Sequence, residues 1–468
     1  MTIYVYFLLC LLTAAATFFA RSRRIVHAAG GVFYFVQALL LAHLFLNGGY
    51  GTACGSFFAF DAAGTLFFVL MILVSGFVFA HSESYLRNNS LPEYRLYFAL
   101  LMLLTTALTG VYFADNIAVT WIFLEGTTLC AAGLIYHRRT AQTLEAAWKY
   151  LFVCSTGIAM AYLGILLLCT AATGGALSYE ALAAAVAEGN PLYLKTAFLL
   201  ILCGYSCKME IFPLYTVGID ANFAAPSPAS ALLSTGLVNA GFLALLRVYA
   251  VLAGSPVFEW VRHVLVLVGV LSLMIGALFL RRTNNYKRFL SYSTVENMGI
   301  AAIGLGIGGA GVWAAVFHVV FHTFIKSSLF LQMAVVRQVY NGYRINRLGD
   351  YMRINRIGAV GILVGTIAVL AFPPSPLFLS ELTILRETLA GDSWWLAIVL
   401  LVLLCIVIYS ICLRLLRLCY QPNQDELHPS LADRKLSWSA LALLLAALVA
   451  GIWQPPFLTT LIDRIAQL

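Results

Sequence analysis

The sequence predicts an all-α polytopic membrane protein, and three observations carry this prediction. The chain has 468 residues, of which 62% are hydrophobic and only 10% are charged. Its mean hydropathy is +0.91. A soluble protein of this composition would expose large apolar surfaces and aggregate. Apolar segments long enough to cross a bilayer also recur from one end of the chain to the other.

We expect about fourteen transmembrane helices, because each apolar segment provides roughly the 20 residues that cross the hydrocarbon core. No hydrophilic stretch is long enough for a soluble domain, so residues 1–468 are expected to form a single membrane domain. The predicted spans are 3–20, 26–47, 61–80, 96–113, 117–135, 147–172, 194–222, 227–251, 258–280, 289–307, 311–336, 357–389, 394–416 and 437–453.

Basic residues are concentrated in alternate loops, which predicts the orientation of the chain. Loops near 114–116, 173–193, 252–257, 308–310 and 390–393 contain none. By the positive-inside rule the basic side is cytoplasmic, which places both termini outside. The net charge of +8 therefore indicates membrane orientation and no nucleic-acid partner. The residues of the basic side are Arg21, Arg23, Arg24, Arg87, Arg95, Arg138, Arg139, Arg281, Arg282, Lys287, Arg288, Arg337, Arg344, Arg347, Arg353, Arg356, Arg414, Arg417, Arg434 and Lys435.

Two spans are interrupted by proline. The seventh breaks at Glu210–Pro213 and the twelfth at Phe372–Pro376. Proline removes a helical hydrogen bond and clashes with the preceding turn, so both helices should be discontinuous. The alternative is an ordinary kink, which membrane helices tolerate.

The two breaks lie five spans apart in helices of opposite direction, which is typical of inverted repeats around a transport site. We expect a first repeat of helices 4–8 at 96–251 and a second of helices 9–13 at 258–417. Helices 1–3 then occupy 1–95, and helix 14 lies in 437–468.

Ionisable residues lie inside the apolar segments, and we expect them to transfer protons. Glu125 is near the middle of the fifth span and Lys208 deep in the seventh. A lysine at the centre of a membrane helix costs about 2.5–3.5 kcal/mol on insertion scales. A Glu–Lys pair whose separation changes can load and release a proton. The alternative is a static buried salt bridge that fixes helix register.

The eleventh span carries His318, His322 and Lys326 at i, i+4 and i+8, on one helical face. Imidazoles pass protons near neutral pH. Zinc binding by the two histidines and satisfied core histidines are the alternatives. Glu381, about two turns after the second break, is expected to close a path that runs in the order Glu125, Lys208, His318, His322, Lys326 and Glu381.

Further candidates are Glu210, Glu296, Asp61 and the pair Glu145 and Lys149, which share one helix face near the cytoplasmic edge. Snorkelling explains that lysine as well as function does. Lys195, Arg247, Arg262 and Arg386, near the outer ends of spans, are expected to be anchors. The ten cysteines include no CxxC pair, and no metal or cofactor site is predicted in this chain.

Several strings together resemble one family: FDAAGTLFF, EGTTL, EAAWKYL, GYSCKMEIFPL, APSPASALLS, YKRFLSYSTVENMGI, HVVFHTFIKSSLFL and PPSPLFLSEL. The chain is similar, over most of residues 55–390, to the antiporter-like membrane subunits of respiratory complex I, Mrp sodium/proton antiporters and group 4 nickel–iron hydrogenases. EAAWKYL, SALLS and FLSEL together resemble the hydrogenase-4 component F branch.

The resemblance implies fourteen core helices, inverted repeats and proton transfer along a central polar axis. It matches Glu125 to the fifth-helix glutamate, Lys208 to the broken-helix lysine, and His318, His322 and Lys326 to the eleventh-helix relay. Glu381 matches the ionisable residue after the second break.

The chain also departs from the family pattern. Glu210 replaces a small residue, Tyr215 stands at the first histidine of the following motif and Asn222 at the second. The eighth-helix ionisable position falls on Ser234 or Asn239.

The leading hypothesis is a proton-translocating subunit of a redox-driven complex in a bacterial or archaeal cytoplasmic membrane. Other membrane subunits and peripheral redox subunits of a hydrogenase- or complex I-like assembly would be its partners, and they would supply the electrons. The alternatives are an Mrp-type sodium/proton antiporter subunit and a structural membrane subunit without transport.

Overall fold

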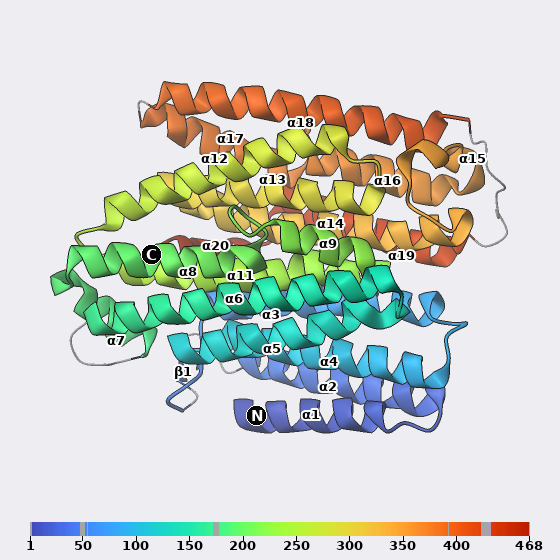
Figure 1. Ribbon diagram of the computed structural model, residues 1–468, viewed down its shortest axis with the longest axis horizontal. Helices are drawn as coiled ribbons and strands as arrows, with labels where there is room; N and C mark the ends of the chain where they lie inside the picture. Colours follow the sequence, from blue (N-terminus) through green and yellow to red (C-terminus); the bar gives the residue numbers. More distant parts are fainter. Residues whose placement is uncertain are drawn as a thin grey trace.

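A computed structural model describes residues 2–46, 52–53, 55–171, 177–391, 393–422 and 432–467. Figure 1 shows a bundle of helices that lie side by side along the long axis, with α7 at one end and α15 at the other. This arrangement confirms the predicted all-α class.

Every predicted span coincides with a helix or with an interrupted helix. The uninterrupted ones are α1 (Ile3–Phe18), α2 (Arg23–Leu46), α3 (Ala62–Tyr85), α4 (Leu91–Phe113), α5 (Ile117–Ile135), α6 (Ala141–Ala171), α12 (Phe258–Arg282), α13 (Tyr286–Ile307), α14 (Ala310–Tyr340), α18 (Trp394–Tyr420) and α19 (Arg434–Trp453). Residues 47 and 172, which end two predicted spans, lie outside the described residues.

Eleven helices in the described part of the chain are long and apolar enough to cross a membrane. The apolar helices α1 and α16 (Arg356–Val369) are shorter. Connecting elements are β1 (Thr52–Ala53), β2 (Ala59–Phe60), η1 (Tyr136–Arg138), α7 (Tyr179–Ala185), η2 (Val186–Glu188), η4 (Ile345–Arg347) and α15 (Tyr351–Ile354). The expected fourteen crossings and the repeat boundaries stay predictions.

Both predicted breaks are present. Helix α8 (Pro191–Met209) ends before Glu210, and α9 begins at Thr216 and runs to Ala224. Helix α16 ends at Val369, and α17 (Pro376–Ala390) follows. Each break contains a residue in the left-handed region, Glu210 at φ 58° and Ala371 at φ 52°. Local side chains bond the freed backbone: Leu214 N donates to Ser206 Oγ (3.3 Å), and Ser375 Oγ donates to Ala368 O (2.7 Å).

Two features were not predicted. The eighth span consists of α10 (Ser227–Leu232), a π-helical turn η3 (Leu233–Leu237) and α11 (Val238–Leu252). Such turns are often found at functional sites. A short helix α20 (Pro456–Ala466) follows α19 and packs against α3 and α14. Its Asp463 Oδ1 accepts a hydrogen bond from Trp313 Nε1 (2.9 Å), near the start of α14.

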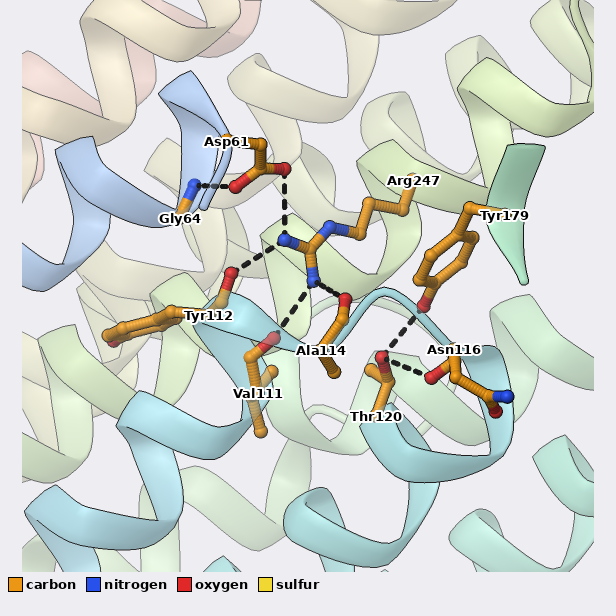
Figure 2. Close-up of polar contacts among 9 residues, drawn as sticks. All are labelled: Asp61, Gly64, Val111, Tyr112, Ala114, Asn116, Thr120, Tyr179 and Arg247. Carbon is orange, nitrogen blue, oxygen red and sulfur yellow. Dashed lines mark hydrogen bonds and ion pairs between the residues drawn. The ribbon is translucent and has the colours of Figure 1, made fainter. Parts of the chain in front are cut away.

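Arg247, which was expected to be an anchor near the outer end of a span, makes its polar contacts inside the bundle. Figure 2 shows its guanidinium at the end of α4, where it donates to the carbonyl oxygens of Val111 (2.9 Å), Tyr112 (2.6 Å) and Ala114 (2.8 Å). These carbonyls have no partner within the helix. Arg247 also forms an ion pair with Asp61 (3.0 Å), which caps α3 through Gly64 N (2.7 Å).

Asp115 lies beside this cluster, in the connection between α4 and α5. Partial burial holds the pKa of its carboxyl above the ordinary value. The carboxylates of Asp61 and Glu180 act in the same direction, and the Arg247 guanidinium opposes them. The positive charge of Arg247 therefore partly offsets the negative charge of the carboxylates at this end of the bundle.

Candidate functional site

Glu125 on α5 and Lys208 on α8 are joined through a hydroxyl group. The Lys208 side chain is fully buried, and its Nζ donates to Thr128 Oγ1 (2.7 Å) and Thr127 Oγ1 (3.2 Å). Thr128 Oγ1 donates in turn to Glu125 Oε2 (3.1 Å), and Ser155 Oγ donates to the other carboxylate oxygen (2.6 Å). The predicted pairing of Glu125 with Lys208 is therefore indirect, and Thr128 bridges the acid and the base.

The eleventh predicted span, α14, places His318, His322 and Lys326 on one fully buried face, as expected. The two imidazole rings are nearly parallel, with centroids 6.5 Å apart. His318 Nδ1 lies 2.9 Å from Ser380 Oγ, and its Nε2 lies 3.2 Å from Asn297 Oδ1. Lys326 Nζ donates to the carbonyl of Leu290 (2.7 Å).

Two residues predicted as secondary candidates, Glu210 and Glu296, interact with Lys326. Both are almost fully buried, and both interact electrostatically with the ammonium group. Glu296 Oε2 accepts a hydrogen bond from Asn297 Nδ2 (2.7 Å), and Glu210 Oε1 accepts one from Asn222 Nδ2 (3.0 Å). Lys326 thus interacts with one carboxylate from the break after α8 and one from α13.

Glu381 on α17 is partly exposed and follows Ser380, the partner of His318. Its carboxylate interacts electrostatically with Glu296. It borders an apolar cavity of about 280 Å³ between α13, the α16–α17 break and α18. The expected order of residues along α14 is wrong. His318 bonds Ser380 on α17, whereas Lys326 interacts electrostatically with Glu210 after α8. The direction of α14 in the bundle cannot be read from residue spacing.

The other predicted candidates lie apart from these contacts. Glu145 and Lys149 form an ion pair (2.5 Å) with side chains 64% and 56% exposed, as snorkelling would give. Tyr215 is partly buried at the start of α9. On the eighth span, Ser234 Oγ bonds Thr294 Oγ1 (2.9 Å), and Asn239 Nδ2 donates to Thr323 Oγ1 (3.0 Å).

Lys287 was assigned to a basic loop, but its side chain is fully buried at the start of α13. Its Nζ donates to Ala225 O (2.5 Å) and lies 5.5 Å from the centroid of the Tyr343 ring. In the sequence Lys287 stands among arginines, so its charge alone does not distinguish it from a loop residue. Its spacing to Ser291 and Thr294, which continue the same buried helix face, could have revealed it.

Several fully buried polar atoms have no hydrogen-bond partner within the described residues. They are Tyr150 Oη, Tyr205 Oη, Glu210 Oε2, Asn222 Oδ1, Ser293 Oγ and both ring nitrogens of His322, among others. Buried polar groups normally bond protein or ordered water. Most of these belong to the same helices as the buried acids and bases, which indicates an interior suited to hydration.

Comparison with known proteins identifies relatives that span most of this chain. The hydrogenase-4 component F homolog of Methylacidiphilum infernorum is 28% identical over 415 residues, which is 86% of each chain. The Na(+)/H(+) antiporter subunit A1 of Staphylococcus aureus is 27% identical over 349 residues, and this chain spans 43% of its length. Both relatives are named as parts of larger assemblies.

Among solved structures, a chain of the archaeal membrane-bound sulfane sulfur reductase, a respiratory membrane complex, has the same fold. The TM-score is 0.86 at 22% identity, and the match covers 99% of this chain and 96% of that one. Residues 114–407 match the model of the transmembrane NADH:quinone oxidoreductase/Mrp antiporter family. The matched part contains both helix breaks and all the buried ionisable residues described above, and the chain belongs to this family of antiporter-like membrane subunits.

Proposed function

We propose that the chain moves protons laterally through the membrane interior as a subunit of a redox-driven complex. One observation carries the proposal: acids and bases that are buried or partly buried recur inside the bundle from α5 to α17. Thr128 links Glu125 to Lys208, and Glu210 follows Lys208 by two residues. Lys326 interacts electrostatically with Glu210 and Glu296, and Glu296 with Glu381.

Where an acid and a base are neighbours, a proton can move without leaving an uncompensated charge. A buried carboxylate and a buried ammonium each stabilise the charged form of the other. When Lys326 gives up its proton, Glu210 and Glu296 lose a stabilising partner, which favours proton uptake by one of them. The imidazole of His318 provides a hydrogen-bonded connection from Asn297 to Ser380, next to Glu381.

We propose that the driving force comes from partner subunits, and the lack of a CxxC motif in the sequence agrees with this. We propose that the partners are membrane and peripheral redox subunits of a hydrogenase- or complex I-like assembly. The 28% identity with a hydrogenase-4 component F homolog over 86% of both chains supports this choice.

Lys208→Met tests the proposal, since it removes the buried ammonium but keeps a long apolar side chain. The intact complex is purified, reconstituted into proteoliposomes and supplied with its electron donor, and internal pH is recorded. We expect the variant to assemble and to lose about tenfold or more of its redox-driven proton movement.

Lys195→Met is the matched control. Lys195 lies on the same helix, its Nζ is 5.5 Å from the Trp260 ring centroid, and it takes no part in the axis. Normal proton movement in Lys208→Met would contradict the proposal and support a structural subunit. Transport that requires sodium would instead support an Mrp-type antiporter.

We further propose that the basic loops face the cytoplasm and that both termini lie outside. The alternation of basic loops supports this orientation. Reporter fusions in cells test it: alkaline phosphatase should be active after residue 467 and inactive after residue 139. The opposite pattern would reverse the orientation.

A further inference from the structure

We propose that Glu210 is the proton carrier that connects the two halves of the axis, in place of an ionisable residue on the eighth span. This inference rests on the proposed function and concerns one step, between Lys208 and Lys326. In that step the Glu210 carboxylate takes a proton from the Lys208 ammonium and passes it to the neutral Lys326 amine, so that one proton moves and no other bond changes.

The break in α8 gives Glu210 its position. Helix α8 ends at Met209, and Glu210 turns into the left-handed region at φ 58° while its N–H still bonds Ser206 O. The residue is 3% exposed. Lys208, which is linked to Glu125 through Thr128, lies two residues earlier. The break therefore places an acid close in sequence to the base that it would serve.

The carboxylate of Glu210 lies against α9. Its Oε1 accepts the hydrogen bond from Asn222 Nδ2 at 3.0 Å. A Cβ at Gly218 would overlap this carboxylate, so the glycine leaves the space that the acid occupies. Asn222 bonds one carboxylate oxygen, and the other, Oε2, is buried without a partner among the residues that the structure describes.

The Glu210 carboxylate has neighbours on the Lys208 side and on the Lys326 side of the proposed step. Lys326 acts on it from α14, and Cys154 acts on it from α6. Tyr150, also on α6, interacts with Glu210 and lies under the Lys208 ammonium, 5.5 Å from the ring centroid to Nζ. Glu210 therefore shares the neighbour Tyr150 with Lys208 and interacts electrostatically with Lys326.

The eighth span offers no competing acid or base at this level within the described residues. Ser234 and Asn239 bond Thr294 and Thr323, and neither titrates in the physiological range. An acid buried in a membrane protein is costly unless it pairs or functions. Glu210 supplies the ionisable group that these two positions lack.

Two substitutions separate proton carriage from helix capping. Glu210→Gln keeps the acceptor for Asn222 but cannot carry a proton. Gly218→Ala leaves the acid in place and displaces its carboxylate, and Gly76→Ala is the control because no atom lies within 4 Å of its added Cβ. Each variant is examined in the intact reconstituted complex for proton movement, redox turnover and thermal stability.

We expect Glu210→Gln to lower proton movement about tenfold or more with assembly and thermal stability retained. Gly218→Ala should lower proton movement by a smaller factor, and Glu210→Asp should retain more proton movement than Glu210→Gln. Gly76→Ala should match the wild type. Normal proton movement in Glu210→Gln, in a complex whose wild type moves protons, would overturn this inference alone. A wild-type complex that moves no protons would overturn the proposed function as well.

Discussion

Thr128 lies between the first buried acid and the first buried base, and its hydroxyl has a hydrogen-bond partner on each side. It accepts from Lys208 Nζ and donates to Glu125 Oε2. A hydroxyl can reorient and thereby change which neighbour it donates to. The bridge therefore keeps the two charges coupled without a direct ion pair.

Replacing Thr128 by valine tests this bridge, because valine keeps the shape and removes the hydroxyl. Lys208 keeps its bond to Thr127, so we expect stability to fall by only about 1.5–3 kcal/mol, the usual value of a hydrogen bond to a charged group. Proton movement should fall severalfold. Thr127→Val is the control, since it also removes a bond to Lys208 but does not contact Glu125. Equal effects of the two variants on transport would argue against the bridge.

Residue types and burial identified most of the candidate axis from the sequence. Glu125, Lys208, Lys326 and Glu381 are conspicuous because charged side chains are rare in apolar segments. Their connections could not be predicted in the same way. The Thr128 bridge, the position of Glu210 beside Lys326 and the direction of α14 all depend on how distant helices pack.

At the scale of elements, the end of α4 depends on one side chain. Arg247 satisfies three carbonyl oxygens there, and its side chain is only 10% exposed. Lysine has a single ammonium and cannot reproduce this planar pattern of donors. We expect Arg247→Lys to lower the free energy of unfolding by about 2–4 kcal/mol, because carbonyls lose their partners.

Thermal unfolding of the purified complex measures this change. Arg386→Lys serves as the control, since Arg386 is exposed on α17 and was also expected to be an anchor. A similar midpoint for Arg247→Lys and the wild type would show that water replaces the guanidinium at this helix end.

The contact between α12 and α13 depends on glycine. A Cβ at Gly269 would lie 2.6 Å from the Gly299 carbonyl oxygen, and this backbone atom cannot move aside easily. Close approach through small residues is common between membrane helices. We expect Gly269→Val to separate the helices, cost about 1–3 kcal/mol and shift Glu296 relative to Lys326.

Yield and thermal stability of the complex report the loss of stability, and proton movement reports the shift of Glu296 relative to Lys326. Gly31→Val on α2 is the comparison, because no atom lies within 4 Å of its added Cβ. Loss of stability in both variants alike would indicate a general intolerance of β-branched residues.

Span positions and helix breaks were predictable because hydropathy and proline act locally. The fifth span was expected at 117–135 and α5 has these bounds, and both proline breaks occur where expected. The π-helical turn Leu233–Leu237 has no comparable signal, since its residues are also compatible with an α-helix. Helix α20 escaped prediction because it is too short to cross a membrane.

At the scale of the whole molecule, we propose that the acids and bases form one series rather than separate sites. Glu125 lies on the fifth predicted span and Glu381 on the twelfth. If protons pass along this series, blocking either end should block the whole path. Effects on a shared path are not additive, whereas effects on independent paths are.

A double substitution therefore tests the continuity of the axis. We expect Glu125→Gln and Glu381→Gln each to lower redox-driven proton movement about tenfold or more. The double variant should move protons as fast as the slower of the two single variants. The measurement is the initial rate of proton uptake in proteoliposomes at equal redox turnover. Glu145→Gln is the control, because it removes an exposed carboxylate outside the axis. If each single variant loses only part of the proton movement and the double variant loses the sum of the two parts, the two ends belong to separate routes.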